Sequence, residues 1–239
     1  STLSSSSAAS DVYKRQPYTY CIDDHSMFFK HPEPVPQNGV WNTRYYYSIE
    51  YGWFDESHFN DHDVIDKVRN AVGNNGDEIL LRDAQVGGIF LEIIYVVSGN
   101  VDLAQIEGVA LGIFMDFQIE WEEWQGAHGA PAAFTYFSID DLPSNMLKFI
   151  ASYRNTTTGQ LLTEIGAYQT NDRPPSPSEV GKTYFKPRQL NLTVGKYIER
   201  DWPAHWNIPH PIEKESGLWH RREILAHSPF IENVEESYP

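Results

Sequence analysis

The spacing of apolar residues changes several times along the chain and predicts alternating strands and helices. Residues 45–53 alternate between large apolar or aromatic side chains and smaller or polar ones, which is the period of a half-buried strand. Residues 56–72 instead carry apolar side chains at helical spacing, and a Gly-Asn-Asn-Gly turn follows at 73–76. Two more strands are expected at 79–81 and 89–97, paired as a hairpin.

Two longer helices follow. Apolar residues recur at helical spacing over residues 103–125, and a capping arrangement of Ser138 with acidic residues starts a helix over 138–154. Pro143 falls in the second turn of that helix and is expected to disturb it. The fold class is therefore α+β: a small antiparallel sheet from residues 41–55 and 78–97 packs against the three helices.

The two ends of the chain differ from this body. Residues 1–16 match the translation of a sequencing adapter, so we expect them to be non-native and the chain to come from environmental DNA. Residues 17–170 are predicted to form one α+β domain. Residues 171–239 alternate short apolar runs with Pro, Trp and His, and we expect an irregular extension that wraps around the domain.

Charge and composition exclude several classes of protein. The net charge is −15 and no basic stripe interrupts it, so nucleic acid is not expected as a partner. The longest apolar run, residues 86–97, is interrupted by Glu92 and is too short for a transmembrane segment. Cys21 is the only cysteine, which excludes an intrachain disulfide and a cysteine-rich metal site. The usual nucleotide-binding, serine-hydrolase and zinc-protease motifs are absent from the sequence.

The segment from Tyr51 to Asp63 contains the first group of candidate site residues. Asp55 is placed to cap the predicted helix. On a helical wheel Asp61 lies near the centre of the buried stripe, His58 lies on its flank, and His62 turns toward solvent. A buried Asp61 needs a partner, and His58 is the nearest candidate. The pair is either structural or part of an acid–base or metal site.

The second and third groups lie on the two long helices. Glu122 and Glu123 stand between Trp121 and Trp124, where burial would raise the pKa of a carboxyl group into a range useful for acid–base chemistry. Two lines of polar residues run along this helix, and one is expected to be solvated: Asp116, Glu120 and Glu123, or Gln118 and Glu122. In the third group, Asp141 suits a helix start, while Asn145 is either a tie to a neighbouring loop or a site residue.

These three groups together resemble a bacterial family known as domain of unknown function 4056. The resemblance covers residues 45–155 and depends on three motifs: GWFDxxH from Gly52, Glu122 or Glu123 with Trp124 at the end of the long helix, and FSxDDLxSN from Phe137. Glu122-Glu123 and Pro143 depart from the family pattern. The family implies no particular reaction. Because its members are often envelope-associated, the resemblance makes export an expectation.

Two functions remain open from the sequence. The first is a hydrolase in which His58 is the base or a metal ligand, Asp61 or Asp55 orients it, and Glu122 or Glu123 is the acid or a second ligand. A divalent metal is optional in this hypothesis. The second is a non-catalytic envelope protein whose 7 Trp and 14 Tyr bind a glycan or a protein. The substrate or ligand is not specified by either hypothesis.

Overall fold

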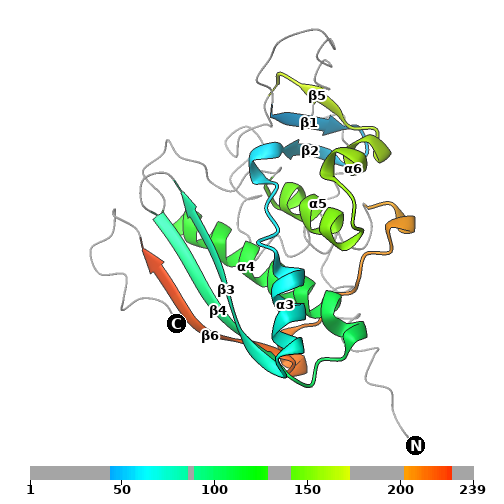
Figure 1. Cartoon of the computed structure of the whole chain (residues 1–239). Helices are drawn as coiled ribbons and strands as arrows, with labels where there is room; N and C mark the ends of the chain where they lie inside the picture. Colours follow the sequence, from blue (N-terminus) through cyan, green and yellow to red (C-terminus); the bar gives the residue numbers. More distant parts are fainter. Residues whose placement is uncertain (1–43, 86–88, 129–140, 173–201, 228–239) are drawn as a thin grey trace, which may run out of the picture.

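The computed structural model describes residues 44–85, 89–128, 141–172 and 202–227. In these residues the strands form two separate antiparallel sheets of three strands each (Figure 1). The predicted α+β class is confirmed. The prediction of one small sheet is wrong, because the strands near residue 50 and those near residue 90 do not pair with each other. The prediction that residues 1–16 are non-native concerns residues outside the described ranges.

The first sheet, sheet A, lies at the top of Figure 1. Its strands, in spatial order, are β2 (Gly52–Asp55), β1 (Tyr45–Ser48) and β5 (Tyr168–Thr170). The single strand predicted over 45–53 is a tight hairpin, in which Tyr47 pairs with Trp53. Both arms keep the alternating pattern, so periodicity alone does not reveal the turn. Gly52 adopts a φ of 79° at the start of β2, a conformation that glycine tolerates best.

The second sheet, sheet B, is longer and combines residues from distant parts of the chain. Its strands, in spatial order, are β3 (Gly76–Gln85), β4 (Ile89–Ser98) and β6 (Trp219–His227). The predicted hairpin of β3 and β4 is confirmed, with Gln85 opposite Ile89, although its tip at 86–88 lies outside the described residues. β6 shows that the tail contributes a regular strand to the sheet. The proposed division at residue 171 stays a prediction.

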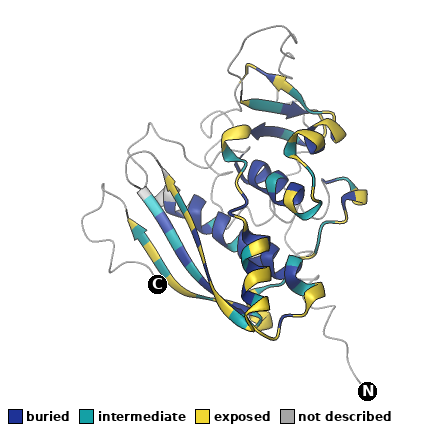
Figure 2. Cartoon of the chain, in the orientation of Figure 1, coloured by how far each residue is buried: buried dark blue, intermediate teal, exposed yellow. Residues whose placement is uncertain are grey.

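The helices fill the space between the two sheets. They are α3 (Val64–Gly73), α4 (Ile106–His128), α5 (Asp141–Tyr153) and α6 (Thr158–Glu164), with single 3-10 turns η1 (Glu56–His58), η2 (Leu103–Gln105), η5 (Ala204–Trp206) and η6 (Lys214–Ser216). α3 and α4 cover the inner face of sheet B, while α5 lies between sheet A and α4 (Figure 1). α4 is buried along most of its length (Figure 2), because sheet B, α3, α5 and the tail all pack against it.

One predicted helix boundary is wrong for a local reason. The helix expected from residue 56 begins only at Val64, because His62 and Asp63 both adopt left-handed backbone angles, with φ of 53° and 52°. The third helix is described from Asp141 onward, and residues 138–140 lie outside the described residues, so its predicted start at 138 stays a prediction. Pro143 lies within the described helix. Ser138, the predicted cap, lies outside the described residues.

The tail packs on α4 through two glycines. The Ile212 backbone N–H donates to the Gly108 carbonyl at 2.8 Å, and a Cβ added at Gly112 would overlap the Ile212 carbonyl oxygen. Trp219 then donates its indole N–H to that same carbonyl at 2.6 Å. This close approach fixes the segment that leads into β6. No helix in the described ranges has the length and hydropathy to cross a membrane.

Replacement of Gly112 by alanine tests this contact. We expect Gly112→Ala to lower the free energy of unfolding by roughly 1–3 kcal/mol, because the added methyl group pushes the tail away from α4. Gly73→Ala is the matched control, since nothing lies within 4 Å of a Cβ there, and it should change stability by less than about 1 kcal/mol. Equal stabilities of the two variants in urea denaturation would contradict the packing of the tail.

Candidate active site

The first part of the site is the short segment that follows β2. Asp55 ends β2 and caps η1, accepting from the Ser57 backbone N–H at 2.8 Å and from the Ser57 hydroxyl at 2.8 Å. Its other carboxylate oxygen is 3.0 Å from the Arg44 guanidinium. The Asp55 backbone N–H donates to the Ser144 hydroxyl of α5 at 2.8 Å. Asp55 therefore fixes the orientation of η1 against α5, as predicted for a cap.

His58 lies at the end of η1 and contacts the start of α5. Its Nε2 is 3.2 Å from Asp141 Oδ1 and 4.0 Å from Asp55 Oδ2. The Asp141 and Asp55 side chains are buried, whereas the imidazole is one-third exposed. Within the described part of the chain, the second ring nitrogen, Nδ1, has no hydrogen-bond partner. The ring thus lies beside a buried carboxylate at one nitrogen, and its side chain is partly exposed.

The predicted contact between His58 and Asp61 is wrong. Asp61 is buried, as expected, but its carboxylate accepts from the Asp63 backbone N–H at 3.4 Å, while His58 turns to Asp141. The prediction that His62 faces solvent is also wrong, because only 8% of this residue is exposed. Both predictions assumed a continuous helix from residue 56, and the left-handed residues before α3 rotate His62 toward the interior.

His62 belongs to a buried polar cluster that joins three parts of the fold. Gln118 of α4 accepts from the Asn145 side chain of α5 at 2.7 Å, so its amide nitrogen donates to His62 Nε2 at 3.0 Å. Asn145 also accepts from the Asn60 backbone N–H at 3.3 Å, and this confirms that it ties down a neighbouring loop. Asn60 in turn places its amide nitrogen 3.2 Å from His62 Nδ1. We call these four residues the amide cluster.

The amide cluster keeps His62 neutral. Burial, and after it the positive charge of Lys67, lower the pKa of His62 to about 4, and the shift is opposed by Asp61 and by a hydrogen bond with the Arg82 backbone. A protonated ring would also direct N–H groups at two amide nitrogens that are themselves donors. The 3.7 Å approach of His62 to Asp83 is therefore not an ion pair near pH 7. Burial raises the pKa of Asp83, partly offset by the Ala84 N–H and by His58.

α4 and α5 run antiparallel, and their contacts form a ladder with four-residue steps. Phe114 meets Phe149 with ring centroids 5.1 Å apart, and Gln118 meets Asn145 one turn further on. Glu122 on α4 and Asp141 on α5 follow at the same four-residue spacing. Both of these carboxyl groups are buried, at 1% and 4% exposure.

The described members of both polar lines on α4 are buried or bound to other side chains, so they do not meet the expectation that one line is solvated. Gln118 accepts from Asn145 of α5, and Glu122 is buried. Asp116 and Glu120 bind Arg221 of β6, whose guanidinium is 2.5 Å from both oxygens of Asp116 and 2.8 Å from Glu120. The side chain of Glu123 lies outside the description, as do Phe137 and Ser138 of the third motif.

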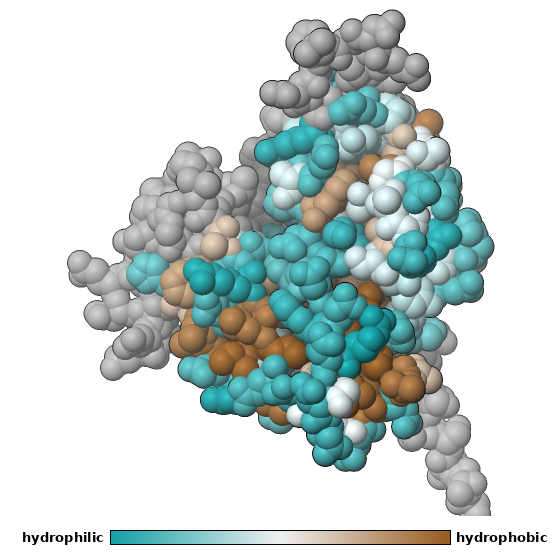
Figure 3. Space-filling model, in the orientation of Figure 1, coloured by the Kyte–Doolittle hydropathy of each residue, from teal (hydrophilic) through white to brown (hydrophobic). Residues whose placement is uncertain are grey.

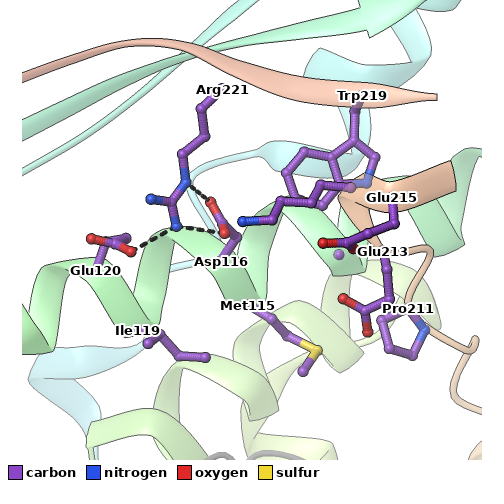
Figure 4. A pocket seen from close by; sticks show the side chains of 11 residues that line it. Met115, Asp116, Ile119, Glu120, Pro211, Glu213, Glu215, Trp219 and Arg221 are labelled. Atoms are coloured by element: carbon purple, nitrogen blue, oxygen red, sulfur yellow. Dashed lines mark hydrogen bonds and ion pairs between the residues drawn. The ribbon is translucent and has the colours of Figure 1, made fainter. Parts of the chain in front are cut away.

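The clearest cavity in the described structure lies beside Arg221, away from His58. It has a volume of about 290 Å³ and lies between α4 and the tail, lined by Met115, Ile119, Trp219 and charged residues (Figure 4). Burial alone would lower the pKa of Arg221, but the hydrogen bonds and negative charge of Asp116, followed by Glu120, raise it. Arg221 is therefore a fixed cation that neutralises buried acids. The lining of this cavity contains carboxylates and Lys214 but no histidine, so we place the candidate site at His58.

Neither a search for metal-binding clusters nor comparison with known proteins assigns a function to the site. Among the described side chains, no group of three or more His, Cys, Asp or Glu residues is arranged to hold a metal ion. No family model, curated protein or solved structure matches the chain. The resemblance to domain of unknown function 4056 stays a prediction.

Sequence reasoning found His58, Asp55, Asp141 and Asn145, but missed Gln118, Ser144 and Asp83, whose roles depend on contacts between distant elements.

The neutral state of His62 predicts an acid-dependent loss of stability. The unfolded chain binds a proton at His62 near pH 6.5 and the folded chain only near pH 4. The His62 contribution is complete above pH 6.5 and is lost as the pH falls toward 4, with a magnitude on the order of 3 kcal/mol. Urea denaturation at about pH 7.5 and about pH 4.5 should show a smaller pH dependence for His62→Gln than for the parent. Identical pH dependence in both proteins would exclude a buried neutral His62.

Proposed function

We propose that the protein is a hydrolase in which His58 acts as a general base on water. The observation that carries this proposal is the geometry of the imidazole: the buried Asp141 carboxylate holds Nε2 at 3.2 Å, and the ring is one-third exposed with Nδ1 unbonded in the described structure. A carboxylate that accepts from one ring nitrogen fixes the tautomer and leaves the other nitrogen as the proton acceptor. The same arrangement stabilises the imidazolium ion once it forms.

The proposed reaction is balanced in atoms and protons. A water molecule gives a proton to His58 Nδ1 while its oxygen forms a bond to an electrophilic carbon of the substrate. The bond from that carbon to the leaving group then breaks, and the imidazolium returns the proton to the leaving group. Asp141 stays ionised throughout and acts as a positioning residue. Ser57 and Ser144 have hydrogen bonds to Asp55, so neither is assigned as a nucleophile.

The surrounding charges restrict the substrate. Asp55, Asp141 and Asp83 all lie near His58, in a chain of net charge −15. Anionic substrates such as phosphate esters are repelled by this environment. Neutral or cationic esters, amides and glycosides are therefore the expected classes. The buried Glu122, four residues beyond Gln118 on α4, is the proposed second carboxyl group, and a metal ion is not required by this scheme.

The binding hypothesis has less support from the structure. Six of the seven tryptophans lie in the described ranges, and each is at most 6% exposed. Trp202, for example, stacks between Tyr51 and Trp206 in the interior. These side chains stabilise the core and do not form a stacking surface for a glycan. Packing therefore explains the tryptophans of the described residues.

A reactivity experiment tests the base without knowledge of the substrate. Diethyl pyrocarbonate modifies unprotonated imidazole nitrogens, so His58 should react in the parent, and Asp141→Asn should slow the modification because the ring loses its orientation. Mass spectrometry locates the modified residue. His205, whose side chain is 68% exposed, is the internal control and should react equally in both proteins. An unreactive His58, or one unaffected by Asp141→Asn, would contradict the assignment.

Catalysis is tested on a panel of chromogenic acetate esters, anilides, glycosides and phosphate esters. We expect turnover of one of the uncharged classes, a loss of about 100-fold or more in kcat/KM for His58→Gln, and little change for His205→Gln. Turnover of the phosphate ester alone, or equal activity of the two histidine variants, would refute the proposal.

A further inference from the structure

The outer face of sheet B carries an apolar patch. Alternate residues of β4 are buried against the helices, and the residues between them, among them Ile94 and Val96, point to the opposite face. Leu80 of β3 and Leu225 of β6 flank them and are 46% and 45% exposed. In Figure 3 brown surface covers this part of the molecule, where the strands lie in front of α4. We call this surface the outer patch.

The outer patch is close to neutral in a strongly acidic protein. Arg82 pairs with Glu92 at 3.0 Å, and Arg222 pairs with Glu78 across β4. Glu223, which lies opposite Ile94 in the register, is the remaining acid on this face. The chain as a whole has a net charge of −15, so most surfaces of two copies repel each other. The outer patch is an exception, because its basic and acidic side chains nearly offset each other. The same balance gives no attraction to an anionic membrane or to nucleic acid.

The outward side chains of β3 form a self-complementary series. Glu78, Leu80 and Arg82 follow one another on the same face, with Leu80 directly opposite Ile94 of β4. We consider a two-fold axis that lies between two stacked sheets, perpendicular to the strands, at the level of Leu80 and Ile94. Rotation about this axis places each of these residues against the same residue of the second copy. The same rotation exchanges the ends of the series, so Glu78 faces Arg82 of the second copy. Stacked sheets bury such faces about 10 Å apart.

We propose that the protein forms a two-fold dimer through the outer patch, with Leu80 and Ile94 at its centre. Three strands of about ten residues present roughly 500 Å² per copy, or about 1,000 Å² in total, from strand rise and spacing. This is below the roughly 1,200 Å² of a standard stable interface, so the dimer is expected to be weak and concentration-dependent. The proposal is independent of the role of His58.

Sedimentation velocity from about 1 to about 300 μM tests the dimer. The sedimentation coefficient of the parent should rise with concentration. Leu80→Glu places two negative charges against each other at the axis, and it should weaken association at least about 10-fold. Leu103→Glu is the matched control, because Leu103 is 79% exposed on η2, outside the outer patch, and this variant should associate like the parent.

A second variant gives a change in the opposite direction. Glu223 lies at the level of the axis on β6 and faces its own counterpart, so Glu223→Gln should tighten association, by about 3-fold or more. A parent that stays monomeric over the whole range overturns the proposal, and so does equal association of Leu80→Glu and Leu103→Glu. Weaker association of Glu223→Gln contradicts the position of the axis.

Discussion

The Gln118 side chain is the interaction on which the arrangement of the site depends. α4 is buried on nearly all sides, so a polar side chain on it must find a partner in another element or be strongly destabilising. Gln118 meets this requirement by accepting from Asn145 of α5 and donating to His62 of the loop before α3. A single amide thereby sets the register of α5 and the path of the loop, and that register brings Asp141 to His58.

The polar residues of α4 that face sheet B also need partners in other elements, because they are largely buried. Asp116 accepts from the Tyr95 hydroxyl and binds Arg221, which joins β6 to the helix. Sheet B and the tail are thus attached through one arginine that binds two carboxylates. The candidate site differs in having a partly exposed histidine beside buried carboxylates, which is an arrangement suited to proton transfer.

Local signals in the sequence predicted much of the fold. The hairpin of β3 and β4, the long helix and the class were correct because periodicity extends over ten or more residues in each. The orientation of His62 was not predictable by the same means, since two left-handed residues interrupt the helical wheel. Asp55, His58 and Asp141 were selected as site residues from their types and positions. That Asp141 rather than Asp61 meets His58 follows from the packing of β2 and η1 against α5, which leaves no local pattern in the sequence.

The most direct test of this account is the tautomer of His58, measured from the 15N chemical shifts of its imidazole ring at a pH where the ring is neutral. We expect the proton on Nε2, where it is donated to Asp141, and an unprotonated Nδ1 that is available as the base. In Asn145→Ala, which removes the amide that sets the register of α5, this preference should weaken toward the mixture found for the exposed His205. A proton on Nδ1 in the parent protein would contradict the central claim.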